Sequence, residues 1–381
     1  TYKKPEKFES VVSASLMSAD AYIGFGNKKF SWTNSFRYNN NRFLLNSLET
    51  SGEYRPNFTD YQTYFSYRPN SKWSFDIIGN YNSNHYNFYP KTRETTFGTM
   101  DNVKSFNVYF DGQENDIFKT TSATFGITRQ FSPTSCISLI ASSFTSNEKE
   151  QYDIQSQYWL TQTESQENLG VGTFFEHARN YLKANVNILK LILKHNIDKH
   201  NIEAGITLKD EHIKEYSNEY EMRDSSGYSI PHTGTDLNMI YSLNANNRIN
   251  SRRIESYIQD TWKFSSANEN TLFTLNYGAR ISHWSYNKET IVSPRISLVV
   301  IPSFNKNITL RLATGVYYQA PFFKELRDTT STNGITTVSL NNKIKSQKSI
   351  HIIAGMDYRF NVANRPFKFS ADAYYKILSN L

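Results

Sequence analysis

The most constraining feature of this sequence is an alternation of apolar and polar side chains that runs through many long segments. Between Lys29 and Asn39, apolar residues at Phe30, Trp32, Phe36 and Tyr38 alternate with polar ones. Successive side chains of a β-strand point to opposite sides, so a period of two predicts a strand with one apolar and one polar face. The same alternation begins again near Trp73, Ile202, Ile308, Ile350 and Phe367. The sequence therefore predicts an all-β protein.

The predicted strands are also unusually long, at roughly 10 to 15 residues, about twice the usual length in globular sheets. A tilted strand that crosses a bilayer needs about this length. Many of the strands carry an aromatic side chain near one end, as expected for rings at the two membrane interfaces. These residues are Tyr38, Tyr67, Trp73, Tyr81, Trp262, Trp284, Tyr318 and Tyr375. Both features favour a transmembrane antiparallel β-barrel, and a β-sandwich with ordinary aromatic residues is the alternative.

Short turns alternate with long polar stretches along the chain. The short turns are expected at 26–28, 68–71, 132–134, 198–201, 265–270, 303–307 and 363–366, and the long stretches at 40–58, 84–115, 148–174, 216–250 and 319–346. Short turns on one side and long loops on the other are typical of outer-membrane barrels. This parity requires two strands between Phe8 and Phe25, divided near Ser18, and gives about fifteen strands in all. Bacterial single-chain barrels have even strand numbers, so we expect the chain to stop before barrel closure.

The composition agrees with a barrel and excludes other classes. No apolar stretch of about 18 residues is present, which excludes a helical membrane protein. Aromatic residues make up 15% of the chain, and the mean hydropathy of −0.60 fits strands whose alternate residues face a polar lumen. The net charge of +7 is dispersed without a dense basic run, so we expect no nucleic-acid partner. The single cysteine, Cys136, excludes a disulfide framework.

Catalytic and metal-binding patterns are absent from the sequence. The eight histidines are dispersed and form no HExxH motif or other metal-ligand spacing. An acidic group falls in the predicted outer stretch 148–174, and its members are Glu148, Glu150, Asp153, Glu164 and Glu167. Several carboxylates suit calcium, but solvated loop charge is the simpler interpretation. We therefore predict a protein that is not an enzyme and has no catalytic residues, no metal site and no cofactor.

Four arginines, Arg37, Arg280, Arg295 and Arg311, occupy the polar phase of predicted strands and are expected to face the lumen. Positive side chains in this position could form an electrostatic track for an anionic solute.

Aromatic residues in two predicted outer stretches are candidates for solute binding, because rings beside amide groups suit sugars, peptides or planar chelates. These residues are Tyr86, Phe88, Tyr89, Tyr317, Phe322 and Phe323. An interfacial aromatic belt explains Tyr317 equally well.

Several phrases of the sequence resemble the TonB-dependent outer-membrane receptors, particularly the branch common in Bacteroidota. They include WTNSFRYNNNRFLL, NFTDYQTYFSYR, DGQENDIF, DSSGYSIP, YIQDTW, YGARISHWSYNKE, SPRISLVVIP, LRLATGVYYQAPFFKEL and PFKFSADAYYKILSNL. These phrases are spread over nearly the whole chain, in the order of the first two thirds of that family's barrel.

The resemblance implies a 22-stranded barrel filled by an N-terminal plug domain, with a TonB-contacting segment before the plug. It implies that lumen-facing residues such as the four arginines line the wall against the plug. We expect residues 1–381 to be the first part of the barrel domain, beginning just after the plug and stopping before closure. Two unpaired strand edges in lipid would be prohibitive, so the working protein is expected to include more chain.

The hypothesis from the sequence is a TonB-dependent transporter in the outer membrane of a Gram-negative bacterium, importing a large scarce solute of the glycan, peptide, siderophore or cobalamin class. Its expected partners are the TonB–ExbB–ExbD complex, reached through the plug, outer-membrane lipid and a surface lipoprotein. The alternatives are a passive or secretion-type outer-membrane barrel without TonB coupling and a soluble all-β carbohydrate-binding protein.

Overall fold

The computed structural model describes residues 4–46, 52–99, 102–225, 237–267, 270–332 and 334–380. In this part of the chain, nineteen strands form one sheet. Parts of the long stretches 40–58, 84–115, 216–250 and 319–346, which the sequence predicts as loops, lie outside the described residues. No described helix is long and apolar enough to span a membrane.

Fifteen of the strands follow one another across the sheet, each antiparallel to the next. They are β1 (Glu9–Ala14), β2 (Ser18–Gly26), β3 (Phe30–Asn40), β5 (Asn57–Asn70), β6 (Trp73–Pro90), β8 (Asn102–Ser132), β9 (Ser135–Gln162), β10 (Glu167–Ile197), β11 (His200–Ser225), β12 (Asn238–Ser265), β13 (Leu272–Trp284), β14 (Glu289–Ile301), β15 (Ile308–Gln319), β18 (Gln347–Val362) and β19 (Arg365–Ser379). This succession confirms the predicted all-β fold and the division of the first segment into two strands.

The remaining elements are short and lie in stretches that the sequence predicts as loops. They are α1 (Arg42–Asn46), β4 (Gly52–Tyr54), β7 (Arg93–Thr99), the 3₁₀ turn η1 (Phe323–Leu326), β16 (Arg327–Thr332) and β17 (Ile335–Leu340). The expectation that 84–115, 148–174 and 216–250 are loops is wrong for most of their described residues. β8 and β10 each have 31 residues, because their ladders continue well past the length that crosses a membrane.

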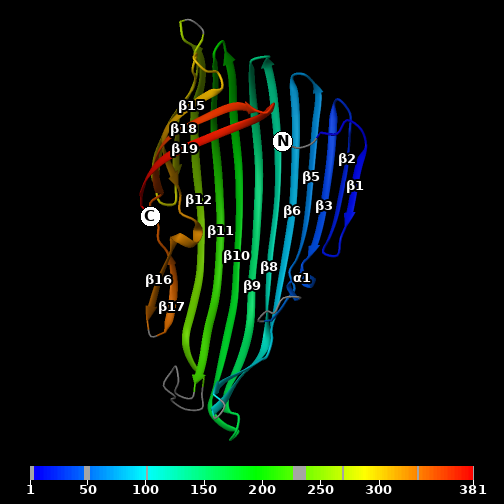
Figure 1. Ribbon diagram of the computed structural model, residues 1–381, viewed down its shortest axis with the longest axis vertical. Coiled ribbons are helices and arrows are strands. Elements are labelled where there is room, and N and C mark those ends of the chain that lie inside the picture. Colours follow the sequence, from blue (N-terminus) through cyan, green and yellow to red (C-terminus); the bar gives the residue numbers. More distant parts are fainter. Residues whose placement is uncertain are drawn as a thin grey trace.

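The sheet is strongly curled and does not close among the described residues. In Figure 1 the long strands β6 to β12 run side by side, and β18 and β19 cross in front of them. Strand β1 pairs only with β2, and β19 pairs only with β18.

One row of apolar residues crosses nine neighbouring strands at the same register. Its members are Phe25, Trp32, Phe65, Ile77, Phe125, Ala141, Leu189, Leu208 and Ile254. We call it the apolar row and the side of the sheet that carries it the apolar face. Six side chains of this row are 40–51% exposed, from Trp32 to Ile254, and Phe25 and Phe65 are half-buried. The described chain therefore has no dry core between two stacked sheets, because one side of its single sheet is an uncovered apolar surface.

The opposite side, the polar face, carries buried hydroxyl groups such as Ser31 and Thr33. At its outer end the segment between β15 and β18 packs back onto it. Leu326, at 1% exposure, lies against Ile249 and Trp284, and β17 pairs in parallel with β12. This packing holds the described residues between β15 and β18 against the wall.

Candidate functional site

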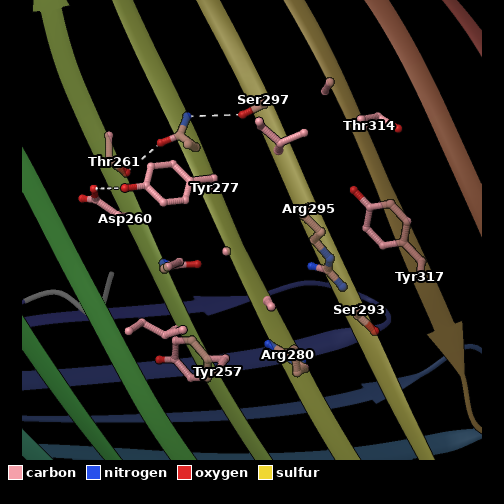
Figure 2. Close-up of a pocket in the computed structure, with 17 residues that line it drawn as sticks. Tyr257, Asp260, Thr261, Tyr277, Arg280, Ser293, Arg295, Ser297, Thr314 and Tyr317 are labelled. Carbon is pink, nitrogen blue, oxygen red and sulfur yellow. Dashed lines mark hydrogen bonds between the residues drawn. The ribbon is translucent and has the colours of Figure 1, made fainter.

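A shallow cavity of about 340 Å³ lies along β12 to β15 and brings together two of the four predicted arginines (Figure 2). Arg280 and Arg295 come from neighbouring strands, and the ladder pairs Arg280 with Tyr257 and Arg295 with Gly278. The rings of Tyr257 and Tyr317 lie on the same polar face, beside the two arginines. In Figure 2 the N-terminal strands, in dark blue, pass behind the cavity.

The two guanidinium groups are held by aromatic rings. The Cζ atom of Arg295 lies 4.3 Å from the centroid of the Tyr317 ring, and that of Arg280 lies 5.7 Å from the centroid of Tyr257. Arg280 also approaches the carboxylate of Glu255 at 3.7 Å, whereas Arg295 forms no ion pair with any described residue. Stacking orients a guanidinium without neutralising it. The cavity therefore presents a positive charge to whatever faces it.

Hydrogen bonds between polar side chains tie the same strands together. The hydroxyl of Thr261 donates to Asn276 at 2.6 Å, and the amide of Asn276 donates to Ser297 at 3.3 Å (Figure 2). Tyr257 donates to Glu203 at 2.6 Å. These contacts fix the wall around the arginines.

Gly278 is needed for this close packing, and its replacement gives a testable prediction. A Cβ atom at Gly278 would lie 2.6 Å from the backbone oxygen of Ile258, whereas a Cβ at Gly126 meets its nearest atoms at 3.9 Å. We expect Gly278→Ala to destabilise the full-length protein by about 1–3 kcal/mol, as overpacking does. We expect Gly126→Ala, the matched control, to change stability little. Thermal unfolding in detergent compares the two, and equal midpoints would contradict the geometry.

The other two arginines lie apart from the cavity and are neutralised. Arg311 on β15 bridges Asp357 at 2.8 Å and Asp372 at 2.9 Å. Arg37 on β3 pairs with Asp20 at 3.0 Å. All four lie on the polar face, but only Arg280 and Arg295 form a group.

The aromatic residues near the outer end of β6 divide between the two faces of the strand. Tyr86 and Phe88 lie on one face and pack on Tyr54, with ring centroids 6.1 and 4.8 Å apart. Tyr89 lies on the other face, 4.6 Å beneath the guanidinium of Arg55. They belong to a strand and do not form one aromatic surface.

The second aromatic group is also divided by the fold. Tyr317 packs on His351 at 4.6 Å within the wall, and Phe323 packs against the cluster of Ile249, Trp284 and Leu326. Phe322 is 63% exposed. Of this group, Phe322 is the residue most open to a solute.

The predicted acidic group is divided between the two faces of the sheet. Glu150 faces the same side as Glu114 and Asp116 of β8, and the carboxylate oxygens of these three residues lie within 4.8 Å of one another. Asp153 is on the opposite face, paired with His177 at 2.6 Å and with Arg179. The expectation of one acidic loop is therefore wrong, because odd and even residues of a strand face opposite sides.

The carboxylate group formed by Glu114, Asp116 and Glu150 lies on the extension of the strands beyond a membrane-spanning length. Asp116 precedes the inner end of β8 by about 16 residues, whereas about 10 residues cross a bilayer. Burial, together with the charge of Asp116, raises the pKa of Glu114 to about 7. Burial also raises the pKa of Tyr86, which lies beside these carboxylates, to about 12. The two-residue spacing of Glu114 and Asp116, which puts both carboxylates on one face of a strand, could be recognised in the sequence. The strand register that brings Glu150 beside them could not.

The sequence matches the family described as TonB dependent receptor-like, beta-barrel, over residues 15–381. This match covers nearly the whole chain. The chain belongs to this family. The resemblance found in the sequence is thereby confirmed, and the curled antiparallel sheet is that of a TonB-dependent receptor beta-barrel domain.

The chain is also similar to several solved structures. The RagAB peptide importer in the "closed-closed" state matches with a TM-score of 0.50 and 11% identity, over 95% of this chain and 44% of that chain. Its "open-open" state matches with a TM-score of 0.51 and 11% identity, over 94% and 43%. BauA, the ferric preacinetobactin receptor from Acinetobacter baumannii, gives a TM-score of 0.47 and 10% identity, over 96% and 58%.

This TonB-dependent receptor barrel thus spans less than half of the RagAB chain. At 11% identity the likeness concerns the fold. No curated protein matches the sequence.

Proposed function

We propose that this chain forms the wall of an outer-membrane receptor that imports a large, scarce solute into a Gram-negative cell by energy from TonB. The observation that supports this proposal best is the exposed apolar row, which crosses nine strands at one register. Hydrocarbon is the solvent in which such a surface is stable. Membership of the receptor family supports the same location.

On this proposal the polar face lines the bore. The cavity of Arg280 and Arg295 then lies on the wall, where a plug domain from the complete protein would pack. The uncompensated charge of Arg295 and the stacked Arg280 suit carboxylates or backbone carbonyls of such a plug. The same plug would carry the contact to the TonB–ExbB–ExbD complex.

The outer extensions of β6 to β12 would stand above the membrane and contact the solute. Their polar face carries both carboxylates and rings, among them Glu114 of β8 and Tyr86 of β6. A peptide is the first solute class to test, because the RagAB structures are named as a peptide importer. Glycans, siderophores and cobalamins are the other classes. A surface lipoprotein is proposed as a partner at this outer end.

Uptake by whole cells tests the proposal. Cells that produce the full-length protein should accumulate a labelled peptide mixture, and deletion of TonB should abolish that accumulation. Accumulation that persists without TonB would favour a passive barrel. Recovery of the full-length protein from buffer without detergent would favour a soluble binding protein, and either result would contradict the proposal.

A further inference from the structure

Three carboxylates meet on the polar face where β8 and β9 continue past the membrane-spanning length. Glu114 and Asp116 lie two residues apart on β8, and the ladder places Asp116 opposite Glu150 of β9. One carboxylate oxygen from each residue lies within 4.8 Å of the other two. Oxygens bound to one Ca²⁺ ion are at most about 5 Å apart, twice a bond of about 2.5 Å. The three carboxylates are therefore close enough to share one Ca²⁺.

The negative charge of this carboxylate group is not balanced by the protein. None of its members forms an ion pair with a described residue, and apart from one another their ladder partners are uncharged. These partners are Phe88, Tyr86, Tyr152 and Asn180. Burial, and then the neighbouring carboxylate of Asp116, raise the pKa of Glu114 to about 7. Like charges held this close are unfavourable without a cation, so the carboxylate group lacks a counterion.

The buried side chain of Asp116 provides a second, independent observation. Asp116 is 8% exposed, and its Oδ1 atom is buried without a hydrogen-bond partner among the described residues. An unpartnered charge in a protein interior is costly, so a buried carboxylate oxygen is normally hydrogen-bonded or bound to a metal ion. The same side chain reaches within 4.8 Å of the oxygens of Glu114 and Glu150. Its free oxygen therefore indicates a missing ligand within the carboxylate group.

Asn180 on β10 holds the third carboxylate in place. Its amide nitrogen donates to Glu150 at 3.0 Å and to Glu219 of β11 at 2.7 Å. The amide oxygen of Asn180 is buried and has no hydrogen-bond partner among the described residues. Calcium takes about six to eight oxygens and accepts amide oxygens and water beside carboxylates. The surroundings of the carboxylate group thus offer a neutral oxygen in addition to the charged ones.

We propose that Glu114, Asp116 and Glu150 bind one Ca²⁺ ion, with water completing its coordination, and that this ion joins the outer extensions of β8 and β9. Calcium suits these carboxylates better than Mg²⁺, which demands near-ideal octahedral geometry at about 2.1 Å and gives up its water reluctantly. No metal site was expected from the sequence, because the register that adds Glu150 is visible only in the ladder.

The geometry of this site is independent of the solute and of TonB. Only the supply of Ca²⁺ from outside the cell rests on the proposed outer-membrane location.

Calcium titration of the full-length protein tests the inference. The protein would be purified in a non-ionic detergent, stripped of metal with a chelator, and titrated with CaCl₂ by isothermal titration calorimetry. We expect D116N/E150Q to lose one Ca²⁺ equivalent, with this site weakened roughly 100-fold or more, because calcium affinity follows the number of charged ligands. The control E164Q/E167Q removes the same charge near the outer turn that joins β9 to β10 and should titrate like the unmodified protein.

Thermal unfolding in the same detergent shows whether the variant is folded. Saturating Ca²⁺ should raise the unfolding midpoints of the unmodified protein and the control equally, and that of D116N/E150Q less, because a ligand stabilises the folded state that binds it. Without Ca²⁺, D116N/E150Q should be at least as stable as the unmodified protein, since it removes two like charges.

Three results would overturn the inference. They are equal calcium titrations of D116N/E150Q and the unmodified protein, binding of Mg²⁺ as tight as that of Ca²⁺, and saturation of the carboxylate group by lysine amide with no bound Ca²⁺. The last result would assign the group to a cationic solute. Uptake with and without TonB decides the proposed function separately, so a failed calcium titration would contradict the calcium site alone.

Discussion

Leu208→Arg is expected to destabilise the full-length receptor by about 2–4 kcal/mol in lipid vesicles and to reduce its insertion into the outer membrane. Leu208 belongs to the apolar row and is 46% exposed. On a water-facing surface such a substitution would cost about 0.5 kcal/mol or less. In hydrocarbon near the middle of the bilayer, an arginine costs about 2–4 kcal/mol.

The adjacent residue provides the control for this prediction. Thr207 precedes Leu208 on β11 and points to the polar face, where its ladder partners are Lys190 and Glu255. We expect Thr207→Arg to change the unfolding free energy by about 1 kcal/mol or less, because the new charge stays in the bore beside a carboxylate. Urea unfolding in vesicles, followed by tryptophan fluorescence, measures both variants. Similar small effects for both would contradict a lipid-facing apolar row.

Reversing both charges of the cavity, with R280E/R295E, is expected to lower TonB-dependent uptake about 10-fold or more while the protein still reaches the outer membrane. On the proposed function these two cations face a plug, and like charges brought together at an interface cost several kcal/mol. Uptake of labelled solute, divided by the amount of folded receptor in the membrane, isolates the effect.

R280K/R295K is the matched variant, because it keeps both positive charges and loses the planar stacking on Tyr257 and Tyr317. We expect it to retain most of the uptake. Unchanged uptake in the charge-reversed variant would show that the cavity does not contribute to transport. An equal loss of uptake in both double variants would mean that the arginines act through stacking on the tyrosine rings. That result would contradict the electrostatic explanation.

The wall of the sheet could be predicted from the sequence because a period of two encodes it directly. The fifteen strands that succeed one another across the sheet correspond to the fifteen expected, including the division between Ala14 and Ser18. The short strands β4, β7 and β16 escaped prediction because they lie in polar stretches, where no buried apolar face imposes an alternation. β17 buries Val338 alone, which is too little to show a period of two.

Strand length was underestimated for a related reason. On the proposed function the outer portions of β8 to β12 lie beyond the bilayer and face water on both sides, so their residues are polar in both phases and resemble loops. The backbone ladder continues there regardless, as the unbroken pairing of β10 with β11 from Gly172 to Ile197 illustrates. Backbone hydrogen bonding between neighbouring strands decides where these strands end. The hydrophobic pattern of the sequence does not reveal this hydrogen bonding.

Groups of residues that depend on the register between strands could not be predicted from the sequence either. The face of each arginine could be predicted from parity, but the pairing that places Arg280 near Tyr257, or Asp116 opposite Glu150, requires the alignment of separate strands. Such sites become visible only when the ladder is known.

The most direct test of the central claim is a scan of collision accessibility along β12. Cys136, the single cysteine of this sequence, would be replaced by serine in the full-length protein together with any cysteine elsewhere in it. Single spin labels would then be placed at each position from 252 to 260 in vesicles. The account predicts that labels at 254, 256 and 258 collide mainly with oxygen dissolved in lipid, and that those at 253, 255 and 257 are shielded from it. Accessibility without a period of two, or shielding of both sets from lipid, would contradict the account.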